Sequence, residues 1–158
     1  MLPTPQPEFP PPRILLDTSV IFAGLKSNSG ASYALLILCE LGLLRPVTSP
    51  YLVAEIERIL GQKAPSALLA FERLQIFINW EFSEDASPEQ VREWEQIIEP
   101  NDAPILALGV SAKVQRLVTL DVKDFLKSPE VTAQSGLKIV TPRQVMVEIR
   151  QVLAHGFA

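Results

Sequence analysis

Ile14-Leu15-Leu16-Asp17 and Leu117-Val118-Thr119-Leu120-Asp121 share one local order, in which a carboxylate directly follows an apolar run. Each run has the length and composition of a buried strand. Apolar strands of this kind are typical of a parallel sheet that helices cover on both faces. Ligand sites in such sheets form outside the carboxyl ends of the strands, so we expect the two aspartates to meet there. An aspartate in this place can also form a turn or cap a helix, and the local pattern leaves that alternative open.

Segments with helical periodicity or helix-start signals lie between the apolar runs. Ser49-Pro50 combines an N-cap residue with a proline at the first helical position, and Ser87 and Gln90 have the spacing of a capping box. Helices are expected over 31–43, 50–61, 66–76, 87–98, 101–112 and from 141 onward, and strands over 14–16, 77–82, 117–120 and 136–140. This alternation predicts an α/β fold in which helices flank a central parallel sheet.

The length and composition indicate one domain. The chain has 158 residues, which is enough to bury a core without disulfides. Its hydrophobic fraction of 47%, against 20% charged residues, agrees with a sheet that is covered on both faces. Six of the first twelve residues are proline, so we expect residues 1–12 to be a disordered leader and residues 13–154 to be the folded domain.

Several classes of site and location are not expected. Cys39 is the only cysteine and lies in an apolar stretch, so the chain offers neither a disulfide framework nor a thiolate metal site. His155, the only histidine, lies close to the C-terminus and is not expected to bind zinc or to act as an acid or base. The N-terminus lacks the features of a signal peptide, and no apolar run reaches the ~20 residues of a membrane span. A cytoplasmic protein without membrane contact is expected.

The charge balance bears on the function. A net charge of −4 opposes simple nucleic-acid binding, which normally uses a basic surface. It opposes a nuclease less, because divalent cations can supply positive charge at the point of contact. Sites made only of carboxylate oxygens suit Mg²⁺ or Mn²⁺.

Further carboxylates could join the two strand-end aspartates. Asp102 lies at a helix start, where it can cap the backbone or point outward. Glu55 lies at the margin of the apolar stripe of its helix, and periodicity does not separate it from Glu57. Asp124 follows Asp121 by three residues, so a helical turn there would bring both to one side and make Asp124 an extra ligand.

A second enzyme class would also use an aspartate after a strand. Phosphatases with an aspartate nucleophile fit Asp17, but their chemistry normally uses a second aspartate two residues later, where this chain has Ser19. Glycine-rich nucleotide-binding motifs are absent from the sequence. The hydroxyls of Thr18 and Ser19 could support the carboxylate by hydrogen bonds or could bond the local backbone.

Several motifs, in order along the chain, resemble those of the PIN-domain family. The matching stretches are Leu16-Asp17-Thr18-Ser19-Val20, Ala54-Glu55-Ile56, Asn101-Asp102-Ala103-Pro104-Ile105-Leu106-Ala107-Leu108, Val118-Thr119-Leu120-Asp121-Val122-Lys123-Asp124-Phe125 and the terminal Lys138-Ile139-Val140-Thr141-Pro142. The resemblance extends from residue 13 to about residue 149. Gly109 stands where the family often has alanine, and Leu120 stands where a small or basic residue is common. Neither departure removes a carboxylate.

The resemblance implies a three-layer, Rossmann-like fold and a metal-dependent endoribonuclease. It implies that Mg²⁺ or Mn²⁺ is held by Asp17, Glu55, Asp102 and Asp121. From their positions in the chain, we expect Asp124 as a further ligand and Thr18 and Ser19 as polar support. The cation would activate water for in-line attack on an RNA phosphodiester.

The resemblance also bears on partners. Small stand-alone chains of the family are similar to the toxin of a type II toxin–antitoxin pair, which implies a cognate antitoxin. We also expect a homodimer: the apolar segment 33–44 could contact a second copy of the chain or an antitoxin, or could instead pack in the core. The alternative is a catalytically weak or inactive PIN-like module that binds RNA or a protein partner.

Overall fold

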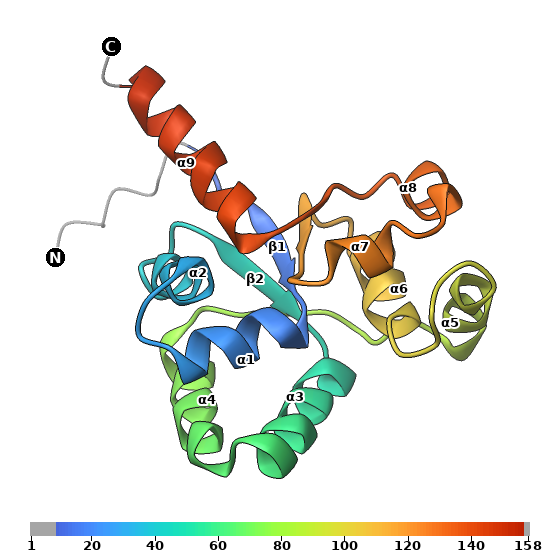
Figure 1. Cartoon of the computed structure of the whole chain (residues 1–158), viewed down its shortest axis with the longest axis horizontal. Helices are drawn as coiled ribbons and strands as arrows, with labels where there is room; N and C mark the ends of the chain where they lie inside the picture. The colour runs from blue at the N-terminus through green and yellow to red at the C-terminus, as the bar shows by residue number, and fades with distance from the viewer. Residues whose placement is uncertain (1–8, 157–158) are drawn as a thin grey trace, which may run out of the picture.

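A parallel sheet forms the centre of the molecule. The computed structural model describes residues 9–156, so the first eight residues of the predicted leader 1–12 lie outside the described residues. Within the described part, the sheet has five strands in the order β3-β2-β1-β4-β5, and every neighbouring pair is parallel. Figure 1 shows β1 and β2 side by side at its centre. The strands are β1 (Arg13–Leu16), β2 (Arg45–Thr48), β3 (Glu81–Phe82), β4 (Arg116–Val118) and β5 (Ile139–Val140).

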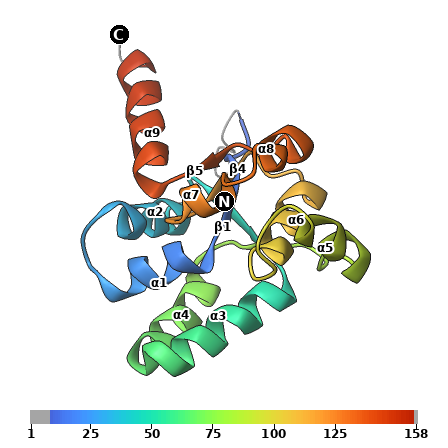
Figure 2. The same cartoon turned by 45° about the vertical axis from the view of Figure 1, so that its right-hand side comes forward.

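Helices cover both faces of this sheet, which confirms the predicted three-layer α/β fold (Figure 2). Successive residues of a strand point to opposite faces. Ile14 and Leu16 therefore join one hydrophobic core, and Leu15 joins the other. The first core includes residues of α1 (Thr18–Lys26), α2 (Ala31–Glu40), α3 (Pro50–Lys63), α4 (Pro65–Phe77) and α9 (Pro142–Gly156). The second includes residues of α6 (Ala103–Ser111), α7 (Val122–Phe125) and α8 (Pro129–Ser135), and α5 (Pro88–Glu95) packs against it.

The helix expected over 31–43 ends earlier, at Glu40. Gly42 has φ +74, a left-handed conformation that glycine adopts without strain. Its N–H donates to the carbonyl of Cys39 at 3.1 Å, and the N–H of Leu43 donates to Leu38 at 3.0 Å, which closes the helix end. The chain can then turn directly into β2.

The strand expected over 77–82 is largely wrong. Phe77 is the last residue of α4, and the N–H of Ile78 still donates to the carbonyl of Leu74 at 2.9 Å. The indole Nε1 of Trp80 donates to the same carbonyl at 3.1 Å. Helix capping therefore takes up most of the segment, and only Glu81–Phe82 remains to pair with β2.

Two elements beside the site were not predicted from the sequence. Helix α1 begins directly after Asp17, whose carboxylate accepts the N–H of Thr18. Strand β2 contains Pro46, which cannot donate a backbone hydrogen bond. The N–H of Arg45 donates to the carbonyl of Pro12, just before β1, and the carbonyl of Thr48 accepts the N–H of Ser83, just after β3. Because hydrogen-bonding groups alternate in direction along a strand, Pro46 faces the segment just before β3.

Other boundaries differ by a few residues. Helix α3 continues to Lys63, α5 ends at Glu95 and β4 ends at Val118. The strand expected over 136–140 is shortened, because Gly136 with φ +64 ends helix α8, which the sequence did not predict. The capping box of Ser87 and Gln90 is confirmed. None of the helices within residues 9–156 is long and apolar enough to cross a lipid bilayer.

Gly109 has a packing reason to be glycine. It lies in α6 against the sheet, and a Cβ there would come within 2.9 Å of Leu137 Cδ1 and 3.4 Å of Leu15 Cδ2. These contacts are too close for an alanine unless the leucine side chains move. The departure from the alanine common in the resembling family therefore belongs to the core and not to the site.

Candidate functional site

Asp17 directly follows β1 at the carboxyl edge of the sheet, as expected. Its N–H donates to the carbonyl of Val118 at 2.9 Å, which ties it to the neighbouring strand β4. The side chain accepts three hydrogen bonds: Oδ1 accepts the N–H of Thr18, and Oδ2 accepts the hydroxyls of Ser19 and Thr119, each at 2.8 Å. This partly buried carboxylate is thus fixed in orientation by groups from both strand ends.

Thr119 links the two strand-end aspartates. It is fully buried, and its hydroxyl donates to Asp17 Oδ2 while accepting the N–H of Asp121 at 3.0 Å. The hydroxyl of Ser19 makes a second link by accepting the N–H of Leu120 at 3.2 Å. The sequence prediction did not assign a role to Thr119. The available signal was a hydroxyl at the end of an otherwise apolar strand, two residues before an aspartate.

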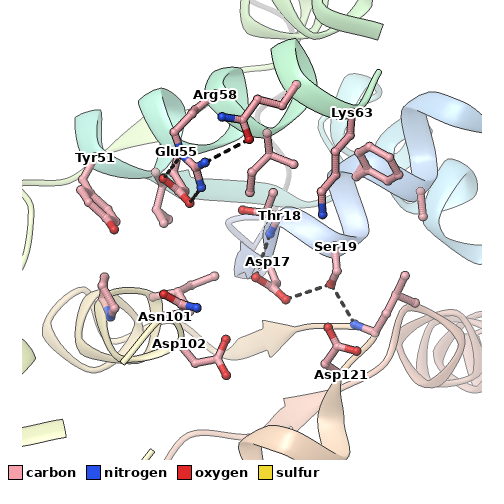
Figure 3. Close-up of a pocket in the computed structure, with 18 residues that line it drawn as sticks. Asp17, Thr18, Ser19, Tyr51, Glu55, Arg58, Lys63, Asn101, Asp102 and Asp121 are labelled. Carbon is pink, nitrogen blue, oxygen red and sulfur yellow. Dashed lines mark hydrogen bonds and ion pairs between the residues drawn. The ribbon is translucent and has the colours of Figure 1, made fainter. Parts of the chain in front are cut away.

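Asp102 and Asp121 come just before helices α6 and α7. Neither carboxylate makes a capping hydrogen bond to its helix within the described residues. The capping role that the sequence left open for Asp102 is therefore absent from this part of the chain. Both side chains lie along the same wall as Asp17 in Figure 3.

Glu55 lies on the opposite wall, which helix α3 forms (Figure 3). Its carboxylate is held by Arg58, with Oε1 at 2.6 Å from Nη2 and Oε2 at 3.1 Å from Nε. These hydrogen bonds lower the pKa of Glu55 below its ordinary value. Glu57, which periodicity could not separate from Glu55, is exposed and does not line this pocket.

Asp124 is not brought into the same pocket. Its Oδ1 lies 3.0 Å from Lys127 Nζ, and the residue lines a neighbouring depression together with Glu99. Its charge is still close enough to contribute to the raised pKa of Asp102. Asp124 thus lies near Asp102 but outside the lining of the pocket, and its role as an extra ligand stays a prediction.

The pocket between these walls has a volume of about 660 Å³. Asp17, Asp102 and Asp121 lie on the side of the strand ends, and α3 contributes Tyr51, Arg58 and Lys63 besides Glu55 (Figure 3). The sequence prediction missed this aromatic and basic wall, because no local pattern shows which face of α3 turns toward the sheet edge.

Two carboxylates of the pocket, those of Asp17 and Asp102, have raised pKa values. Burial raises the pKa of Asp17 above its ordinary value, and the three hydrogen bonds that it accepts oppose the rise. Burial, followed by repulsion from Asp17 and three other carboxylates, raises the pKa of Asp102 to about 6. Such mutual repulsion is relieved when a positive ion enters the cluster.

The donor set fits a hard divalent cation. All candidate ligands are carboxylate oxygens, which Mg²⁺ and Mn²⁺ prefer. Asp17 Oδ1 accepts one hydrogen bond from the described residues and so keeps a lone pair free. Within residues 9–156, however, no three acidic, histidine or cysteine side chains are grouped closely enough to hold an ion as they stand. A cation held by one or two of these carboxylates would complete its coordination with water, as Mg²⁺ commonly does.

A comparison with known families decides the relationship. The family model of the PIN domain matches residues 13–123, which is most of the chain. The chain belongs to the PIN-domain family. The matched range contains Asp17, Glu55, Asp102 and Asp121 of this PIN domain and stops one residue before Asp124.

Solved structures share the fold of this PIN domain. VapBC2 from Rickettsia felis, bound to a DNA fragment from their promoter, has 18% identity and a TM-score of 0.58, covering 82% of this chain and 98% of the solved chain. VapBC-1 from nontypeable Haemophilus influenzae has 21% identity and a TM-score of 0.58, covering 83% and 98%. PAE2754 from Pyrobaculum aerophilum has 18% identity and a TM-score of 0.56, covering 89% and 96%. No match is found among curated proteins. At these identities the likeness establishes the fold.

Proposed function

We propose that this PIN domain is a metal-dependent endoribonuclease. The observation that carries the proposal is the pocket in which Asp17, Asp102 and Asp121 lie along one wall although they come from three separate parts of the chain. An uncompensated group of carboxylates is unfavourable for a folded protein, so its presence in a pocket points to function.

The residues of the pocket suit hydrolysis of a phosphodiester. Asp17, Asp102 and Asp121 would hold Mg²⁺ or Mn²⁺, with Glu55 contributing from the opposite wall. When bound, such a cation supplies positive charge to the phosphate and lowers the pKa of water. Ser19 and Thr119 fix the orientation of the Asp17 carboxylate through its Oδ2.

Cleavage should require a divalent cation. The purified protein is incubated with a labelled single-stranded RNA of mixed sequence, and products are followed on a denaturing gel. We expect cleavage in Mn²⁺ or Mg²⁺ and none in excess EDTA, because the carboxylates alone repel the phosphate. An inactive PIN-like module would instead bind the RNA without forming product. The variant Asp17→Asn, purified in parallel, controls for contaminating ribonucleases, and cleavage that persists in EDTA contradicts the proposal.

We further propose that the chain is the toxin of a toxin–antitoxin pair. Two structures with this fold are VapBC proteins, one of them bound to promoter DNA. The partner would be a cognate antitoxin, the protein would form a homodimer and it would act on RNA in the cytoplasm. Expression should arrest bacterial growth, and co-expression of a short DNA-binding protein encoded next to this gene should restore it. Normal growth of cells that accumulate the folded wild-type protein contradicts this assignment, and sedimentation tests the homodimer.

A further inference from the structure

The two walls of the pocket carry opposite kinds of charge. The strand-end wall is acidic, whereas the described cationic residues that line the pocket, Arg58 and Lys63, both belong to α3. The chain as a whole has a net charge of −4, so cations in this place are not part of a generally basic surface. The cationic side chains that could contact an RNA phosphate in the pocket therefore come from α3.

The side chains that line this part of α3 share one face of the helix. Tyr51, Glu55, Arg58 and Gln62 follow at intervals of four, three and four residues, which places them in a single row. All four line the pocket. The row therefore runs along the pocket wall, and Arg58 lies within it next to Glu55 (Figure 3). On its other side Arg58 donates a hydrogen bond to Gln62.

Arg58 is held in a geometry in which a phosphate could take the place of the Glu55 carboxylate. Its Nη2 and Nε donate to the two oxygens of Glu55 at 2.6 and 3.1 Å, and its Nη1 donates to Gln62 Oε1 at 3.2 Å. The planar fork of a guanidinium binds carboxylate and phosphate in the same two-pronged way. The side chain is 53% exposed, so burial does not lock it onto Glu55.

Glu55 cannot serve Arg58 and a cation equally well. Each of its oxygens accepts one hydrogen bond from the guanidinium and keeps a lone pair for a cation, but a cation bound there repels the guanidinium and weakens the pair. Once the carboxylate turns to a cation, the guanidinium is left in the pocket without its anion. The nearest anion that a substrate brings is a phosphate of the RNA backbone.

We propose that Arg58 binds a phosphate of the RNA strand and that Glu55 holds its guanidinium in place until a divalent cation takes up that carboxylate. The inference rests on the proposed function, since it assigns the substrate contact of the same pocket. A purely structural pair between residues three apart on a helix surface would stabilise the helix slightly and leave RNA binding unchanged.

RNA affinity as a function of salt tests the phosphate contact. Fluorescence anisotropy of a labelled single-stranded RNA of mixed sequence is measured with Ca²⁺ in place of Mn²⁺, and gels check that the RNA stays intact. Arg58→Ala should weaken binding about tenfold at low salt and reduce the slope of log K against log salt by about 0.7, the value for one lost contact to a single strand. Arg58→Lys should recover part of the affinity, because it keeps the charge and loses the fork.

Two further measurements separate exchange from a structural role. In EDTA, Glu55 should keep Arg58 occupied, so the difference in RNA affinity between wild type and Arg58→Ala should shrink. In a chain that carries Glu55→Gln, adding Arg58→Ala should again lower the RNA affinity in EDTA. Mn²⁺ affinity, measured by calorimetry, should rise up to about fivefold in Arg58→Ala, because Glu55 is released from a surface ion pair. Arg150→Ala, which removes an exposed arginine of α9 that does not line the pocket, is the matched control and should change neither quantity.

The outcomes distinguish this inference from the proposed function. An unchanged salt slope in folded Arg58→Ala, with Mn²⁺-dependent cleavage intact in the wild type, overturns the inference alone. A reduced slope in Arg58→Ala, without cleavage by the wild type in any cation, supports the phosphate contact and overturns the nuclease proposal. A wild-type protein that binds no RNA at low salt overturns the inference. Equal weakening by Arg58→Ala and Arg150→Ala also overturns it, since the effect would then be one of net charge.

Discussion

Replacing Asp17 by asparagine should lower metal-dependent RNA cleavage by at least about 10³-fold, since several kcal/mol of charge stabilisation would be lost. The carboxylate is the most constrained of the cluster, with three hydrogen bonds from Thr18, Ser19 and Thr119. An amide keeps its size and removes its negative charge. Single-turnover cleavage in Mn²⁺ measures the effect, and an unaffected rate would overturn the assignment of Asp17.

The same substitution should leave the fold intact. The amide oxygen can still accept the N–H of Thr18, and the hydroxyls of Ser19 and Thr119 can rotate to accept its NH₂ group. Burial raises the pKa of the native carboxyl, so a neutral group at this position is easier to bury. Circular dichroism and urea unfolding check this. Asp124→Asn is the matched control, because it removes a carboxylate outside the pocket and should keep most of the activity.

The strand-end aspartates could be predicted because their signal is local. An apolar run that stops at a carboxylate shows the end of a buried strand, and parallel pairing then places two such ends together. The structure pairs Leu16 with Val118, so the residues that follow, Asp17 and Thr119, come side by side. Which strand lies beside β1 is a long-range property, and it was inferred from fold class alone.

Helix α1 was not predicted from the sequence, because tertiary contacts stabilise it more than its composition does. Its sequence, Thr18–Lys26, contains β-branched residues, an aromatic residue and Gly24, all weak helix formers. Gly24 lies so close to α2 that a Cβ would come within 2.5 Å of Leu36 Cδ1. Close packing on the sheet and on α2, together with the Asp17 cap, supplies what local propensity lacks.

The basic wall of the pocket illustrates a different limit. Glu55 was favoured over Glu57 only through family resemblance, because both lie at the margin of the apolar stripe of α3. The structure turns Glu55 toward the pocket and leaves Glu57 outside, where it accepts a 3.5 Å hydrogen bond from Gln75 of α4. The packing of α3 against α4 thus determines which face of α3 lies toward the strand ends. The sequence of α3 alone does not contain that information.

Thr119→Val should weaken both folding and cleavage, although valine has almost the same shape. The hydroxyl is fully buried and serves two aspartates, donating to Asp17 Oδ2 and accepting the N–H of Asp121. Its loss leaves buried polar groups without partners, which costs about 1–3 kcal/mol in the free energy of unfolding. Residues that orient metal ligands typically contribute about 10–100-fold to activity, and we expect a cleavage loss in that range. Urea unfolding and cleavage rates in Mn²⁺ measure the two effects.

The comparison with Thr119→Ser separates positioning from packing. Serine keeps the hydroxyl and loses a methyl group, so it should destabilise the fold while keeping most of the cleavage rate. Valine should lower the cleavage rate far more than serine does, because Asp17 and Asp121 lose the hydroxyl that joins them. If the hydroxyl orients Asp17 toward a cation, higher Mn²⁺ should restore part of the activity of Thr119→Val. If valine and serine lower the rate equally at temperatures where both variants are folded, Thr119 acts through packing alone, and the link between the two strand ends has no part in catalysis.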